Sequence, residues 1–468
     1  MAFICFVGPY KPIMCGIADY TDFLARQLPH GGWAVLSFDP HAYGGPLTGD
    51  GEILGNHIWH GIPGRDGFSA SVIERGLNEL GGLHDDVVLW FQYEFGIWPD
   101  HHRFVTMLKC LKMPKVVTMH TLHFQSSETP SGMRKCEIEM LRDLLPCVDA
   151  ITVFGYGVWR AVNFAFPEYG DKVYVIKHGI HSYPDVSRMS RMEAKEQLNE
   201  FLLYESDLAQ ETKEALHKQR TFIDPHTFVV GQTGFLCPLK GSEALYDVTD
   251  KLRKLIPSRR IAAVRIGTSR DGFQRAYTER LRGQGNSTDK FILETWLPLQ
   301  MLPVAQRAFD VNFYWPKDCT QSGIVAHALG AGATIVGRDM ESTGETFSEA
   351  GAATASHLSQ LVSKVQAVIL NSELTSVIEQ QALQYAAEFS WTNQARRHAE
   401  LANRIREMSD TQSLDHVLED VVPGALTSYT ADILPGKGMG RFSREQSGHG
   451  LQYDGNAHYQ GVRGAYGG

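Results

Sequence analysis

The sequence predicts an α/β protein built from two doubly wound, Rossmann-like domains that face each other across a cleft. Its 468 residues are too many for one hydrophobic core. In each half, short β-branched and aromatic runs alternate with longer helical patterns, which is typical of parallel sheets covered on both faces. A charged stretch without strand patterns, residues 187–220, separates the two halves.

The first half supplies the strands and helices of the first predicted domain, residues 1–183. Helical patterns occur at residues 17–28, 100–111 and 133–145. Strands joined by helices give a parallel sheet, and ligands of such domains bind outside the carboxyl ends of the strands. Continuous apolar runs predict the buried strands at residues 2–8, 86–92, 115–119, 150–154 and 173–177.

The second half repeats this alternation in a predicted domain of residues 227–388, after a helical insertion at residues 184–226. A last helix, within residues 389–410, is expected to return toward the first domain. Residues 434–468 are rich in Gly, Tyr, His and Ser without an apolar period, which predicts a disordered tail. Strands are predicted at residues 228–232, 261–266, 291–294, 311–313 and 334–336, and further helices at 374–389 and 392–408.

Composition narrows the class of protein. The net charge of −9 argues against a nucleic-acid binder, which usually carries a basic surplus. The first residues lack the basic stretch of a signal peptide, and no run approaches the roughly 18 apolar residues of a membrane span. The seven cysteines are scattered without a C-x-x-C pair, which favours reduced thiols over a zinc site. We expect a cytoplasmic protein.

Three residues of the first domain follow predicted strands and are candidates for chemistry. Gly16 opens a helix, where backbone N–H groups can approach a phosphate. Glu94 and His120 come directly after two further strands, so both are expected beside the cleft. The plainer alternatives are a turn glycine, a solvated loop carboxylate and a core histidine, and the residues alone leave these open.

The second domain offers a second set of candidates. Lys240 stands beside a helix start, and a lysine there suits a diphosphate. Ser322 and Gly323 open a helix of small residues, with Ser322 as the expected N-cap. Glu341 and Glu345 follow the strand at 334–336 and lie one helical turn apart if a helix has begun there. A surface lysine and tight helix–sheet packing are the alternatives.

Taken together, the motifs resemble those of glycosyltransferase family 4, especially its bacterial members. The resemblance covers about residues 3–408. Each motif is weak alone, but their order and spacing make the set fairly specific. The motifs are C-G-I-A-D-Y-T at residues 15–21, Q-Y-E-F-G-I at 92–97, T-M-H-T at 118–121, H-G-I at 178–180, G-F-L-C-P-L-K-G at 234–241, S-G-I-V-A-H-A-L-G-A-G at 322–332 and F-S-W at 389–391.

The resemblance implies a GT-B fold and a sugar transfer from a UDP-, GDP- or ADP-sugar to a glycan, lipid-linked or other acceptor. It implies retention of anomeric configuration, no metal and no cofactor, with the acceptor on the side of the first domain. Peripheral membrane contact and oligomerisation stay open. By position, Gly16 would lie near the donor phosphate, and Lys240 with the amides of Ser322 and Gly323 would contact the diphosphate. The remaining roles fall to Glu341 or Glu345 on the ribose, and to His120, Lys240 and Glu94 as the catalytic residues.

Two departures from the family pattern keep other functions open. The usual E-x(7)-E carboxylates align with Cys319 and His327, and the usual loop arginine aligns with Phe235. A sugar-nucleotide epimerase or phosphorylase of the same fold is therefore an alternative to the transferase. A non-catalytic homologue that binds a glycan or a partner is another, and fold alone does not decide between them.

Overall fold

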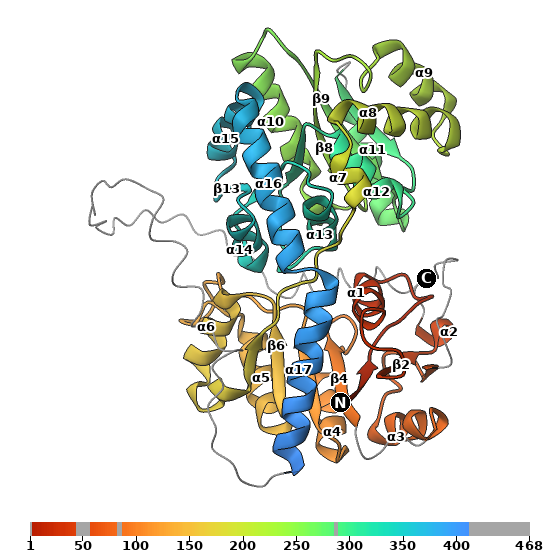
Figure 1. Cartoon of the computed structure of the whole chain (residues 1–468), viewed down its shortest axis with the longest axis vertical. Coiled ribbons are helices and arrows are strands. Elements are labelled where there is room, and N and C mark those ends of the chain that lie inside the picture. Colours follow the sequence, from red (N-terminus) through yellow and green to blue (C-terminus); the bar gives the residue numbers. More distant parts are fainter. Residues whose placement is uncertain (1, 44–56, 82–86, 285–288, 411–468) are drawn as a thin grey trace, which may run out of the picture. The chain divides into compact units, whose positions relative to one another are not determined.

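The computed structural model describes residues 2–43, 57–81, 87–284 and 289–410. The tail predicted at residues 434–468 lies outside them. Both sheets belong to one compact unit, residues 1–406. Figure 1 shows helices on both faces of each sheet.

The first sheet has seven parallel strands in the order β3-β2-β1-β4-β5-β6-β7. Alternate residues of β1 enter different cores, Cys5 and Val7 on one face and Ile4 and Phe6 on the other. This burial on both faces explains why β1 is apolar throughout. The strands are β1 (Phe3–Val7), β2 (Trp33–Phe38), β3 (Ile58–Ile62), β4 (Val87–Tyr93), β5 (Lys115–Met119), β6 (Ala150–Val153) and β7 (Val173–Val175), and the helices are α1 (Gly16–Ala25), α2 (Pro40–Tyr43), α3 (Ala70–Glu79), α4 (His101–Cys110), α5 (Lys135–Leu144) and α6 (Tyr156–Ala165), with 3-10 turns η1 (Leu145–Cys147) and η2 (Pro167–Lys172).

The second sheet has six parallel strands in the order β10-β9-β8-β11-β12-β13. It too is covered on both faces, because Val229 of β8 enters one core while Phe228 and Val230 enter the other. The strands are β8 (Thr227–Thr233), β9 (Arg260–Gly267), β10 (Lys290–Glu294), β11 (Val311–Tyr314), β12 (Ile335–Arg338) and β13 (Ala353–Ala355), and the helices are α10 (Ser242–Leu255), α11 (Gly272–Gly283), α12 (Met301–Ala308), α13 (Gly323–Gly330), α14 (Glu341–Glu349), α15 (Leu358–Leu370) and α16 (Ser372–Glu388), with the 3-10 turn η4 (Pro238–Lys240).

The helical segment between the sheets packs on the second sheet's side. It comprises α7 (Pro184–Arg188), α8 (Arg191–Glu200), the π-helical turn η3 (Phe201–Glu205) and α9 (Gln210–Gln219). Buried Lys195 of α8 pairs with Asp310 at 2.7 Å, and Asp310 also accepts the N–H of Val229 in β8. The ion pair therefore fixes α8 against the amino-terminal ends of the central strands β8 and β11.

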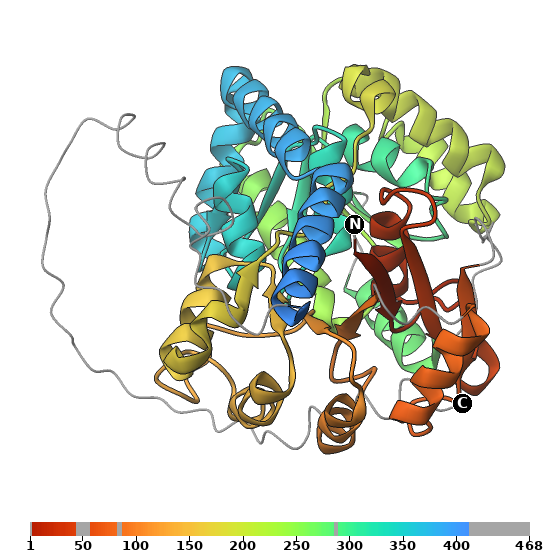
Figure 2. The same cartoon turned by 60° about the horizontal axis from the view of Figure 1, so that its bottom comes forward.

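The chain crosses between the two sheets twice, and the crossings lie side by side. Ile180 N–H donates to Phe389 O at 2.9 Å, and Trp391 N–H donates back to Ile180 O at 3.3 Å. After the second crossing, α17 (Trp391–Asp410) lies against the first sheet (Figures 1 and 2), where Trp391 and Ile405 join the core of β1.

The prediction of two doubly wound, Rossmann-like domains is confirmed. The sequence reading missed three strands, β2, β3 and β13. The segments β3 and β13 are short edge strands and only partly buried, so they lack the continuous apolar run on which the prediction depended. In contrast β2 is buried throughout, and its run W-A-V-L-S-F has the same mostly apolar character as the strands that were predicted.

Candidate functional site

The loops that follow the strands of the two sheets meet each other. The Thr320 hydroxyl, after β11, donates to the carbonyl of His120, after β5, at 3.1 Å. The Thr343 hydroxyl in α14 donates in turn to Thr320 O at 3.2 Å. The candidate residues of both domains are therefore gathered at one junction of carboxyl strand ends, where doubly wound sheets bind ligands.

Lys240 ends the turn η4 after β8, and its ammonium group lies 6.0 Å from the centre of the Tyr314 ring. Within the described part of the chain, Lys240 Nζ has no ion-pair partner and no hydrogen-bond acceptor. The Tyr314 hydroxyl lies 3.1 Å from the Cys319 sulfur and also bonds Ser322, the N-cap of α13. Tyr314 thus lies between these two features, contacting the ammonium group of Lys240 with its ring and the N-cap of α13 with its hydroxyl.

The N-terminus of α13 is open to solvent. Gly323 is exposed, and no described atom lies within 4 Å of the position that a β-carbon would take there. Ser322 is the N-cap as expected, but its side chain makes no capping hydrogen bond. The first N–H groups of α13 therefore point, uncapped by a side chain, into space that an anion can enter.

Helix α1 begins in the same way in the first domain. It starts at Gly16, which is exposed, and no described atom lies within 4 Å of a β-carbon built there. Its N-cap is Cys15, without a side-chain hydrogen bond to the helix. A helix start with an exposed first glycine and no side-chain cap from its N-cap residue therefore occurs in both domains.

A buried cation supports the loop that carries Lys240. Arg265 of β9 is fully buried and donates to the carbonyls of Gln232, Phe235 and Ile266 at 3.1, 2.6 and 2.7 Å. Among the described residues no carboxylate lies within ion-pair distance of it, and burial lowers the pKa of its guanidinium to about 10. Arg265 shapes the loop start and adds positive charge beneath it. The sequence reading missed this residue, because an arginine inside an apolar strand shows no partner in the sequence.

His120 is held as a neutral ring. Burial, with a smaller effect of neighbouring His178, lowers the pKa of His120 to about 3. Its Nε2 lies 2.7 Å from the Gln92 side-chain oxygen, so Nε2 carries the proton and Nδ1 is the acceptor. The Tyr20 and His120 rings pack edge to face, with their centres 5.0 Å apart. A neutral imidazole in this setting can accept a proton or a hydroxyl hydrogen bond but does not carry charge.

Glu94 folds back on its own loop. Its carboxylate accepts the Gly96 N–H at 2.6 Å, and burial raises its pKa above the usual range. It lies close enough to Cys15 to help raise the pKa of that thiol, although burial is the larger cause. Glu94 is therefore near the start of α1, at the neighbouring strand end.

Glu341 and Glu345 are one turn apart at the start of α14, and both bond to the first domain. Glu341 is buried and accepts the N–H groups of Phe124 at 2.7 Å and Gln125 at 3.2 Å. Its φ of 49° is unusual for a residue other than glycine, and the Gln125 side chain accepts its backbone N–H. Burial raises the pKa of Glu341 above its usual range.

Glu345 caps the first helix that follows β6. Its Oε1 accepts the Gly157 N–H at 2.7 Å, where the positive end of α6 favours a carboxylate. A β-carbon at Gly155 would lie 2.3 Å from Glu345 Oε2, so only glycine permits this approach. Among the described residues Oε2 is buried without a hydrogen-bond partner, and burial raises the pKa of Glu345.

An ion cluster that the sequence reading missed joins the same two domains. Asp318, after β11, accepts from His123 Nε2 at 3.1 Å and from Arg134 at 2.8 Å. His123 Nδ1 lies 2.5 Å from Glu137, which is buried. Burial alone would lower the pKa of His123, but bonds to Asp318 and Glu137 outweigh it and raise this pKa to about 9. We name these four residues the His123 cluster; no sequence spacing relates its members across 195 residues.

The two positions where family carboxylates are missing are internally bonded. The Cys319 thiol donates to Gln321 O at 3.0 Å. His327 stacks on His181 with ring centres 3.9 Å apart, and its Nδ1 lies 2.6 Å from the Tyr183 hydroxyl. Burial lowers the pKa of His327 to about 3. His327 therefore serves the packing beside the first chain crossing, and Cys319 is bonded within its own loop.

An aromatic edge lies beside the Lys240 loop. The Phe235 ring, after β8, is 6.4 Å from the ring of Trp296, which follows β10 and is half-exposed. The guanidinium of Arg270, after β9, lies 4.3 Å from the Phe235 ring centre. These three side chains, the aromatic edge, continue the strand-end row from β8 toward β10.

Two facing Rossmann-like domains joined by two chain crossings define the GT-B fold class. The structure resembles the UDP-forming α,α-trehalose-phosphate synthase of Burkholderia xenovorans with a TM-score of 0.61 at 14% identity, covering 86% of this chain and 99% of that one. The synthase of Burkholderia vietnamiensis gives 0.62 at 12% identity, with 88% and 100% covered. Anabaena HepE in complex with UDP and glucose gives 0.59 at 12%, with 86% and 100% covered.

At these identities the likeness establishes the fold. No protein-family model and no curated protein sequence matches the chain. Among the helices of the described residues, none has the length and apolar character to cross a membrane.

Proposed function

We propose that this protein is a glycosyltransferase that moves a sugar from a nucleoside-diphosphate sugar to a carbohydrate, lipid-linked or other acceptor. The observation that carries the proposal is that Lys240, which has no anionic partner among the described residues, and the open N-terminus of α13 both lie beside Tyr314. A lysine and the N–H groups of a helix start are both groups that bind a diphosphate. The shared fold with HepE, which was solved with UDP and glucose, supports this choice.

The order of the strand ends sets the orientation that we propose for the bound donor. With the diphosphate at Lys240 and α13, the aromatic edge of Phe235, Trp296 and Arg270 is the surface on which a nucleobase stacks. The sugar then extends toward the first domain, where Gly16, Glu94 and His120 gather. The donor would thus be held by the second domain and the acceptor by the first.

The chemistry on the donor side is electrostatic. Negative charge grows on the leaving diphosphate as the glycosidic bond breaks, and Lys240 with the α13 amides stabilises it without a metal. Arg265 keeps the Lys240 loop in place. We propose retention of configuration, with an oxygen of the donor taking the acceptor proton, and His120 and Glu94 orienting acceptor hydroxyls through their unprotonated ring nitrogen and carboxylate.

The positions of Glu341 and Glu345 add a conformational requirement. Both carboxylates accept backbone N–H groups of the first domain in this closed arrangement. If either binds the donor ribose, the domains must first move apart and then close again over the donor. Domain closure around a substrate is a common way to exclude water from such reactions.

The test is nucleotide binding by the full chain, followed by turnover. Thermal-shift measurements with UDP, GDP and ADP should find one that stabilises the protein, by about 2.7 kcal/mol at 100 times its dissociation constant. Lys240→Ala should weaken this binding and cost about 2–4 kcal/mol in transition-state stabilisation. Lys254→Ala, an exposed lysine at the far end of α10, is the matched control and should change neither.

The outcomes separate the competing functions. Release of nucleoside diphosphate with the sugar attached to an acceptor supports the transferase, whereas epimerised donor or sugar phosphate supports the epimerase or phosphorylase. Nucleotide binding without turnover on any acceptor favours a non-catalytic homologue, for which the bonded states of Cys319 and His327 are the structural argument. No binding of any nucleotide by the wild-type protein would refute the donor site itself.

A further inference from the structure

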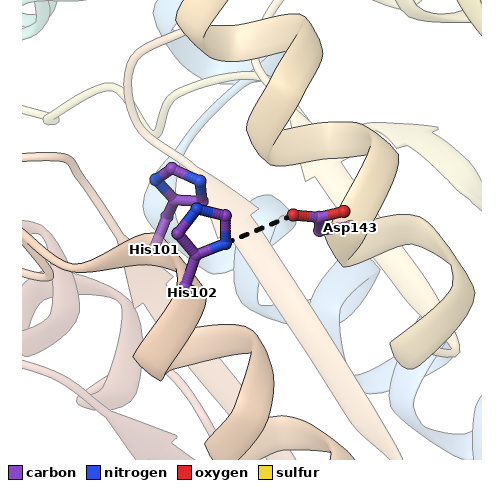
Figure 3. A group of neighbouring side chains, drawn as sticks. All are labelled: His101, His102 and Asp143. Carbon is purple, nitrogen blue, oxygen red and sulfur yellow. Dashed lines mark ion pairs between the residues drawn. The ribbon is translucent and has the colours of Figure 1, made fainter.

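Three metal-ligating side chains gather on the first domain, at helices that carry none of the proposed donor or acceptor residues. His101 and His102 are the first two residues of α4, and Asp143 lies in the last turn of α5. One ligand atom from each residue lies within 4.8 Å of the others. Figure 3 shows the carboxylate of Asp143 reaching from α5 toward the His102 ring.

The spacing is close to that of a metal centre. Bonds of about 2.0–2.2 Å to zinc in tetrahedral geometry place ligand atoms about 3.3–3.5 Å apart. His102 Nδ1 and Asp143 Oδ2 are already 3.5 Å apart. The ligand atoms all lie within 4.8 Å of one another, so a side-chain rotation of roughly 1 Å brings them to this spacing, which these partly exposed groups can make.

A simple ion pair between His102 and Asp143 does not account for the third residue. The His101 ring lies 4.0 Å from the His102 ring, tilted by 42°. A ring nitrogen of each histidine can therefore approach one cation together with the Asp143 carboxylate. Among the described residues His102 is the only ion-pair partner of Asp143, and the C-terminal end of α5 favours a positive charge there.

We propose that His101, His102 and Asp143 bind one zinc ion and thereby link α4 to α5. Two imidazole nitrogens and one carboxylate oxygen match the ligands zinc prefers, with water in the open position. Magnesium and calcium prefer all-oxygen sites and fit this set poorly. The zinc site goes beyond the proposed sugar transfer and does not depend on it. Its ligands lie in the first domain, whereas Lys240 and α13 lie in the second.

The experiment measures zinc binding by the metal-free full chain. Calorimetry should find that the wild type binds one zinc per chain. His102→Ala and Asp143→Asn should each bind zinc with an affinity at least 10-fold lower. His217→Ala, an exposed histidine of α9, is the matched control and should bind zinc as the wild type does. The double variant His449→Ala, His458→Ala controls for the histidines of the C-terminal segment.

A second readout keeps the test independent of affinity alone. Cobalt added in place of zinc should give the intense visible absorption of a four-coordinate site in the wild type, and zinc should raise its unfolding temperature but not that of Asp143→Asn. Of the five substituted residues, His102, Asp143 and His217 are exposed or partly exposed, and His449 and His458 lie outside the described residues. Far-UV circular dichroism verifies the fold of each variant. Equal zinc affinity in the wild type and His102→Ala, or an equal loss in His217→Ala, would overturn the proposal.

Discussion

The His123 cluster makes the stability of the closed two-domain arrangement depend on pH. Hydrogen bonds to Asp318 and Glu137 raise the pKa of His123, against the effect of burial, from 6.5 to about 9. Since one pKa unit corresponds to about 1.36 kcal/mol, the charged His123 stabilises the folded protein by about 3 kcal/mol. A raised pKa means that this stabilisation is complete below pH 6.5 and lost as pH rises through about 9.

The perturbation that tests this is Asp318→Asn. Asp318 and Glu137 each bond one ring nitrogen of His123, so removing the Asp318 charge should lower the His123 pKa by roughly 1 unit. Ring-labelled histidine NMR measures that pKa directly, with His123→Gln identifying the signal. The same His123→Gln variant should lose the fall in unfolding free energy between pH 6.5 and 9.

Asp185→Asn is the control, because Asp185 pairs only with exposed Arg188 within the described chain. It should leave the His123 titration unchanged. The reasoning is refuted if His123 titrates near 6.5 in the wild type, or if Asp318→Asn leaves its pKa where it was.

Two further predictions concern the donor and the metal. Glu345→Ala should raise the donor's Michaelis constant about 10- to 100-fold with turnover largely kept, because a carboxylate on ribose hydroxyls bonds equally in the ground and transition states. Exposed Glu373→Ala is its control, and a silent Glu345→Ala beside an affected Glu341→Ala would mean that the ribose is held one helical turn earlier. Sugar transfer should survive excess EDTA, since the proposed zinc site is on the other domain from Lys240; loss of turnover that magnesium restores would contradict this.

Much of the fold was predictable because it produces patterns within short stretches of the sequence. Strands such as β1 are buried on both faces, so their residues are apolar without interruption and the pattern needs no knowledge of neighbours. The helix starts at Gly16 and Gly323 were likewise predictable, since each glycine follows a strand and loop and directly precedes a helical pattern. Partly buried edge strands such as β13 lack this continuous apolar pattern, because their burial depends on packing against residues distant in the sequence.

The candidate site divides along the same line. The sequence by itself determined which residues follow strands, and thus that Lys240, Ser322, Glu94 and His120 gather at strand ends. Only the tertiary structure decided what each one touches. In that structure Glu341 accepts a backbone N–H group of the loop after β5, and buried Arg265 donates to a carbonyl of the Lys240 loop. Asp318 accepts from His123.

The physical reason is range. Periodicity and helix starts arise from interactions within a few residues, so they leave a signature in the local sequence. Hydrogen bonds and ion pairs across the junction join residues about 200 positions apart, and each partner taken alone is an ordinary charged or polar residue. Their pairing is specified by the packing of two whole domains, which no short stretch of this sequence contains.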